Sequence, residues 1–204
     1  MKISFMEDTM KKIAIIYGAC ENGIQKKAIE TLTRELLDYT VEYPTCIQAD
    51  AEINRELFHQ YIYVGTKANN PYLAALDKHP TAPEGYVITV KDDTVYIEGT
   101  DDAGVLYGCV DFYAKYIIKA EYTNKSQPYW KNPFDDGFVL PDFELASSPS
   151  ITKRGLWTWG HVIYDYRRYI DNMVKLKMNT VIIWNDFVPV NIKEIILSLT
   201  MLSM

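Results

Sequence analysis

Residues 169–186 read YIDNMVKLKMNTVIIWND, and this stretch decides how the second half of the chain is expected to fold. Apolar residues recur in it at the spacing of one helix face, which predicts a helix over residues 164–176. The β-branched run at 180–184 predicts a strand, and residues 151–157 predict another one before the helix. Strand, helix and parallel strand in this order predict a right-handed βαβ unit.

A unit of this kind opens a parallel α/β barrel. A complete (β/α)₈ barrel needs roughly 250 residues, which is more than the 204 residues of the whole chain. We therefore expect a truncated βαβ start of a TIM barrel, without the later strand ends on which such a barrel carries its catalytic groups. The apolar tail at 191–204 has no charged face, which also favours a truncation.

The first half of the chain mixes strands with helices. A short apolar run at 12–17 precedes a helical pattern over 22–39, and residues 61–64 predict a second strand. Residues 85–91 and 94–99 alternate apolar and polar side chains across Asp92-Asp93, which predicts a β-hairpin. The class is therefore α+β, a small mixed-sheet sandwich with helices on one face and the other face free for a neighbouring domain.

Three further elements are predicted in this half. Residues 41–47 form a strand that Pro44 weakens, and residues 71–78 form a short helix. A longer helix ends near Ile118, and Asp101 or Asp102 caps its first turn.

Residues 121–149 change in character, because four prolines and several aromatic residues interrupt any regular pattern. This composition predicts an irregular connection between two domains. The expected division is an α+β accessory domain with its linker at 1–149 and the first barrel unit at 150–204.

Charge and composition exclude several classes of partner. The net charge is -6 and the basic residues are scattered, which argues against nucleic acid. No stretch is apolar enough for a membrane span, and charged residues interrupt the start of the chain, where a signal peptide would need an apolar run. These features predict a cytoplasmic protein.

Cysteine and histidine usage predicts neither a disulfide framework nor a metal site. Three widely spaced cysteines are expected to be reduced thiols: Cys20, Cys46 and Cys109. The three histidines lack ligand spacing. The loop Gly18–Gly23 lacks the Lys-Ser/Thr of a P-loop and GxGxxG, so we interpret it as a turn, and no cofactor or metal is predicted.

Three stretches together resemble bacterial glycoside hydrolases that place a small α+β domain before a catalytic barrel. They are PEGYVITVKDDTVYIEGTDDAGVLYGCVDFYAKYII at 83–118, the link from Pro149 to Lys153-Arg154-Gly155, and the stretch at 169–186. The chain is similar in these features to family 20 β-hexosaminidases and to the related family 84 and family 67 enzymes. The resemblance implies a hexosaminidase-like accessory domain, a parent enzyme of carbohydrate metabolism and a carbohydrate substrate for that parent.

The resemblance also implies where substrate would bind. Arg154 matches the arginine that grips substrate hydroxyls in family 20, and Trp157 and Trp184 could stack on a pyranose face. Trp184 stands where family 20 usually has histidine, and Asn185-Asp186 replaces a Thr-Asp-Asp type run, which argues against hexosaminide specificity. The alternative is that Arg154 pairs with a nearby carboxylate and the tryptophans fill the junction between the domains.

Glycoside cleavage usually requires two carboxyl groups. Asp186 follows a predicted barrel strand, but Asp165 and Asp171, its nearest acidic neighbours, lie before and within the preceding helix. No catalytic pair is predicted, since the acid and base of these families lie on later strands. Arg154, Trp157, Trp184 and Asp186 remain as predicted substrate-binding residues.

Two functions follow from these observations. The first is the non-catalytic N-terminal region of a glycoside hydrolase, inactive alone because its barrel is truncated. The alternative is a free-standing module that binds a glycan or a protein. In either case the apolar run Val181-Ile182-Ile183 predicts self-association through the C-terminal segment.

Overall fold

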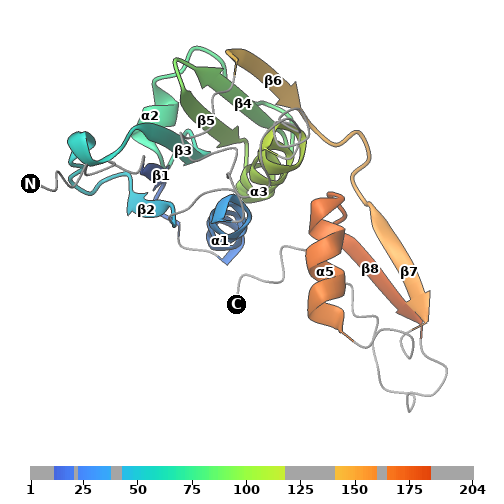
Figure 1. Ribbon diagram of the computed structural model, residues 1–204. Coiled ribbons are helices and arrows are strands. Elements are labelled where there is room, and N and C mark those ends of the chain that lie inside the picture. The colour runs from blue at the N-terminus through green and yellow to red at the C-terminus, as the bar shows by residue number, and fades with distance from the viewer. Residues whose placement is uncertain (1–11, 21–22, 38–42, 118–140, 160–164, 185–204) are drawn as a thin grey trace, which may run out of the picture.

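The computed structural model describes residues 12–20, 23–37, 43–117, 141–159 and 165–184. Within them lie a six-stranded sheet with the order β2-β1-β3-β5-β4-β6 and a two-stranded sheet, β7-β8 (Figure 1). The strands are β1 (Ile13–Tyr17), β2 (Thr45–Gln48), β3 (Gln60–Thr66), β4 (Tyr86–Lys91), β5 (Thr94–Gly99), β6 (Phe143–Ser147), β7 (Gly155–Trp159) and β8 (Thr180–Trp184). The helices are α1 (Gly23–Leu37), α2 (Pro71–Ala74), α3 (Asp102–Phe112) and α5 (Tyr166–Lys175).

The larger sheet is mixed, as predicted. β1 pairs in parallel with β2 and β3, and β3 pairs in parallel with β5. The predicted hairpin is β4 and β5, which are antiparallel. Asp92 and Asp93 join them with φ angles of 49° and 58°, the left-handed backbone that a two-residue type I′ turn requires.

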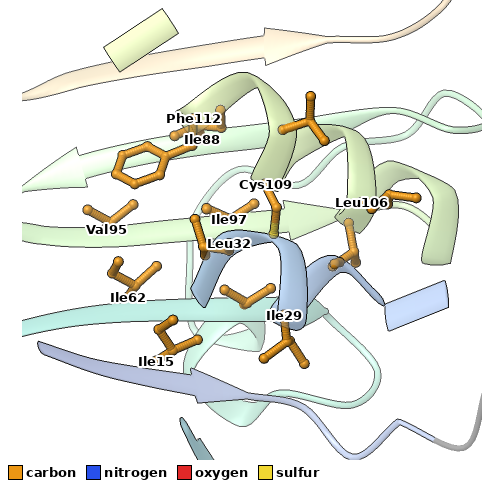
Figure 2. Close-up of a cluster of buried hydrophobic side chains, with 14 of the residues drawn as sticks. Ile15, Ile29, Leu32, Ile62, Ile88, Val95, Ile97, Leu106, Cys109 and Phe112 are labelled. Atoms are coloured by element: carbon orange, nitrogen blue, oxygen red, sulfur yellow. The ribbon is translucent and has the colours of Figure 1, made fainter. Parts of the chain in front are cut away.

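The main core lies between this sheet and the helices α1 and α3 (Figure 2). Ile15, Ile62 and Ile97 point from the strands toward Leu32 of α1 and Leu106 of α3, and all five are at most 1% exposed. Removing these apolar side chains from water stabilises the fold. The two long helices therefore cover one face of the sheet, as expected.

The opposite face carries a smaller cluster around Tyr63 and Leu73. Leu73 comes from the single turn of α2, so this face is partly covered rather than free. The predicted helix at 71–78 is limited to Pro71–Ala74. Asn70 caps it by accepting a hydrogen bond from the Tyr72 amide.

The prediction of an irregular connection over 121–149 is wrong where the structure describes it. Residues Phe143–Ser147 form β6, which pairs antiparallel with β4 at one edge of the sheet. Its side chains alternate between half-buried and exposed, the pattern of a strand with one covered face. The prolines around it hid this alternation. Residues 118–140 lie outside the described part of the chain.

The predicted helix that ends near Ile118 is α3, which gives way at Phe112 to one π-helical turn, Tyr113–Ile117. Asp101 caps it: its Oδ1 accepts the Gly104 amide at 2.9 Å. The same carboxylate accepts the Glu84 amide at 2.8 Å, so the cap also fixes the turn before β4.

The second sheet and the helix that connects its two strands are the predicted strand, helix and parallel strand. β7 and β8 pair in parallel, and α5 lies between them in sequence. α5 ends in a Schellman motif, in which the Lys177 amide donates to Val174 O at 2.8 Å and the Met178 amide donates to Met173 O at 2.9 Å.

Candidate functional site

β7 and β8 hold two of the predicted substrate-binding residues. Trp157 is 65% exposed and its register partner Ile182 is 55% exposed, so the two form an apolar surface patch. Trp184 is the last residue of β8 and lies in register with Trp159. Asp186 lies outside the described residues. Val181, the residue before Ile182 in β8, is 4% exposed, so the exposed patch lies on the opposite face of the strand from Val181.

Arg154 precedes β7 and is engaged within the chain. Its Nη2 donates to Glu84 Oε2 at 2.6 Å and to the Tyr107 hydroxyl at 3.1 Å. Its other side-chain nitrogens donate to three backbone carbonyls, those of Ile151, Thr152 and Lys177. The guanidinium also lies 5.6 Å from the centre of the Tyr107 ring, within the range of a cation–π contact.

This geometry directs Arg154 toward the first sheet and its helices. The ion pair with Glu84 is the pairing that the sequence left open as the alternative to sugar binding. Each guanidinium nitrogen already has an acceptor, so a sugar hydroxyl would have to replace one of them. The substrate-binding role of Arg154 stays a prediction.

Lys177 forms a second contact with the first half of the chain, and the sequence reasoning missed it. Its Nζ donates to Asp111 Oδ2 at 2.7 Å and to the Tyr86 hydroxyl at 2.8 Å. Two signals could have found it. Lys177 follows a helix at the position where glycine is usual, and Asp111 is a single carboxylate in the apolar segment Val105–Phe112.

Asp111 is 5% exposed and remains a strong acceptor. Burial by itself would raise the pKa of this carboxyl, but hydrogen bonds from Lys115, Lys177 and Tyr86 together lower the pKa below its ordinary value. Burial likewise raises the pKa of the Tyr86 phenol, so it stays a neutral donor to Asp111. The site is therefore an ionised carboxylate that holds two ammonium groups.

The carboxyl ends of β1 and β3 are a second place where an open α/β sheet could bind a ligand. Here the amide side chains of two asparagines close it. Asn69 Nδ2 donates to Ala19 O at 3.1 Å, and Asn70 Nδ2 bridges Ile16 O and Val64 O at 3.1 and 3.0 Å. A Cβ at Gly18 would lie 2.2 Å from Asn69 Oδ1, so the chain has glycine there for close approach. This end of the sheet is built for packing.

The described ranges offer little else that could carry chemistry. They contain no group of three or more histidine, cysteine, aspartate or glutamate side chains placed to hold a metal ion. Cys20, Cys46 and Cys109 are free thiols, and burial raises the pKa of Cys109 to about 12. No helix in this part of the chain combines the length and apolar character needed to span a bilayer.

The described residues form an α+β domain with a mixed sheet, followed by a strand, a helix and a parallel strand. Residues 11–112 match glycosyl hydrolase family 20, domain 2, and the chain belongs to this family. The predicted resemblance to glycoside hydrolases is thereby confirmed. No curated protein sequence matches the chain significantly.

Solved structures show the same fold. A family GH115 4-O-methyl-α-glucuronidase with specificity for decorated arabinogalactans is 17% identical with a TM-score of 0.59, over 85% of this chain and 25% of that one. The structure of CpGH84D is 15% identical with a TM-score of 0.55, over 85% and 27%. A chitobiase from Flavobacterium johnsoniae is 17% identical with a TM-score of 0.50, over 86% and 24%. The chain thus spans about a quarter of the length of the structures it matches.

Proposed function

We propose that this chain is the non-catalytic accessory region of a carbohydrate-active glycoside hydrolase, with residues 150–204 as the first strand, helix and strand of its barrel. The observation that carries the proposal is the family 20 domain at residues 11–112, followed after β6 by a parallel β7-α5-β8 unit. Three glycoside hydrolase structures with the same fold each extend well beyond the length of this chain.

The acidic residues of the β7-α5-β8 unit support the non-catalytic part of the proposal. Most glycosidases use two carboxyl groups placed on either side of the scissile bond. In the described part of this unit, Asp165 Oδ1 caps α5 by accepting the Arg168 amide at 3.1 Å. Asp171 pairs with Lys27 at 3.0 Å. Both carboxylates therefore have structural partners and neither faces the other.

The test is an assay of the purified chain against 4-nitrophenyl N-acetylglucosaminides and glucuronides, the sugar classes of its structural relatives. We expect release of nitrophenol at the buffer rate, because the described part of the β7-α5-β8 unit places no two carboxyl groups together for catalysis. An intact family 20 hexosaminidase in parallel wells shows that the assay works. Turnover that rises in proportion to the amount of chain would refute the non-catalytic role.

The exposed pair Trp157 and Ile182 favours an interaction surface as a second function of the same region. We expect the chain to self-associate, since each side chain gains about 2 kcal/mol when its apolar area is buried. Sedimentation velocity should show a dimer whose dissociation constant rises at least about ten-fold in the double variant Trp157→Ser, Ile182→Thr. Leu57→Ser, which removes an apolar side chain 54% exposed elsewhere on the surface, is the matched control. A wild-type chain that stays monomeric at high concentration contradicts the prediction.

A further inference from the structure

The β7-α5-β8 unit has little core of its own. In its helix only Met173 and Val174 are buried, and Val174 belongs to the main core of the first domain. The helix has 10 residues and its sheet has two strands in the described part of the chain. A helix of this length and a two-stranded sheet are each marginal in water without tertiary packing. The unit therefore needs a surface to fold against.

The first domain offers that surface, which we call the docking face and define as Glu84, Tyr86, Tyr107 and Asp111. Tyr86, Tyr107 and Asp111 are at most 5% exposed. The carboxylates of the docking face receive three donors from the unit: Arg154 on Glu84 Oε2, Asn179 on Glu84 Oε1 at 3.1 Å, and Lys177 on Asp111. α5 also contacts α3, and in Figure 1 it is the element of the unit that lies on the side of α1 and α3.

Lys177 shows that the chain gives up local stability for this contact. Its φ is 56°, at the position of the Schellman motif where glycine is usual. A side chain in this left-handed conformation costs about 1 kcal/mol. In return, the ammonium group reaches Asp111 and lies 5.0 Å from the centre of the Tyr86 ring. Glycine would form a better cap and would lose both contacts.

We propose that the docking face is the folding template for β7, α5 and β8, so that this unit is ordered only while Arg154 and Lys177 are bound to the docking face. The inference goes beyond the proposed carbohydrate function and does not depend on it. According to this proposal, the first domain helps another part of the same chain to fold. Its docking face binds two cationic side chains and one amide side chain of the β7-α5-β8 unit, and this binding completes the fold of the unit.

Lys177→Gly separates this role from simple helix capping, because the two predict opposite signs. If Lys177 is a template contact, its replacement should lower the hydrogen-exchange protection of α5 and β8 amides at least about ten-fold and leave α1 and α3 amides unchanged. If Lys177 acts only as a helix cap, the same substitution should raise the protection of α5 amides. The control is Lys175→Gln, which removes the longer 3.4 Å pair between Lys175, at the end of α5, and Glu35 of α1. It should change the protection little. Unchanged or raised protection in Lys177→Gly overturns the proposal.

A measurement on the unaltered chain covers the case in which Lys177→Gly does not fold. Hydrogen exchange at increasing urea, below the unfolding transition, ranks the opening free energies of the elements. The template requires that no amide of α5 or β8 exchanges more slowly than the slowest amides of α1 and α3. Slower exchange in α5 or β8 would show that the unit folds independently and would overturn the proposal.

Discussion

Replacing His79 with alanine is expected to lower the free energy of unfolding by about 3 kcal/mol near neutral pH, because it leaves a buried carboxylate without its partner. Glu98, on β5, is 2% exposed. Its two oxygens lie 2.9 and 3.0 Å from His79 Nδ1, which donates to them. Urea unfolding followed by tyrosine and tryptophan fluorescence measures the loss.

The loss should depend on pH in a defined direction. Burial raises the pKa of Glu98 above its ordinary value, and the hydrogen bond and charge of His79 only partly oppose this. Without His79 the pKa rises further. A carboxyl with a raised folded pKa stabilises the fold below its unfolded pKa, and this stability is lost as pH rises through the folded pKa. We therefore expect the deficit of His79→Ala to shrink below about pH 4, where Glu98 is protonated in both states.

The neighbouring residue provides the matched control. Lys78 pairs with Glu144 at 2.7 Å, but the Lys78 side chain is 72% exposed, and exposed pairs contribute little. Lys78→Ala should leave the unfolding midpoint within error. If His79→Ala behaved in the same way at neutral pH, water would have to replace the imidazole at no cost, and the interpretation of Glu98 as a desolvated carboxylate would be wrong.

The sequence predicted those helices and strands whose pattern is complete within a few neighbouring residues. The hairpin was visible because Asp92-Asp93 joins two alternating runs, and α1 and α5 were visible from the spacing of their apolar residues. β6 was missed because its alternation at Phe143–Ser147 is short, its neighbours are prolines, and its partner β4 lies far back in the chain. A strand with one covered edge depends on that partner more than on its own propensity.

The candidate site was harder to predict for the same reason. Arg154 was singled out, but its acceptor Glu84 is 70 residues away in sequence, and Asp111 is 66 residues from Lys177. Nothing in the local sequence pairs these charges. Lys177 could have been noticed as a departure from the glycine expected at a helix end, and Asp111 as a single carboxylate in an apolar segment. Such departures from a local rule indicate that a side chain is needed elsewhere.

Replacing Gly104 with alanine is the second change with a large expected effect, a loss of about 3 kcal/mol in the free energy of unfolding. Gly104 is in the first turn of α3, where the helix passes over the turn before β4. A Cβ at this position would lie 2.1 Å from the carbonyl oxygen of Gly85. That oxygen cannot move away freely, because it accepts the Thr100 amide at 2.9 Å.

The strain should spread to the helix cap, since the Gly104 amide donates to Asp101 and Asp101 also holds the Glu84 amide. Moving α3 away from Gly85 would lengthen both hydrogen bonds and shift Glu84, which binds Arg154. Thermal unfolding measured by circular dichroism should show the loss as a lower Tm. Hydrogen exchange should show faster exchange of the amides at position 104, which is alanine in the variant, and at Thr100.

Gly108, one turn further along the same helix, is the control for this prediction. A Cβ there would lie 2.7 Å from the Ile97 Cγ2, a side-chain atom that can shift, whereas the atom facing Gly104 is backbone. Alanine also gains about 1 kcal/mol of helix propensity over glycine at either position. We expect Gly108→Ala to be much milder than Gly104→Ala. Equal effects of the two substitutions would mean that side-chain crowding over β5, and not the backbone contact with Gly85, sets the distance of α3 from the sheet.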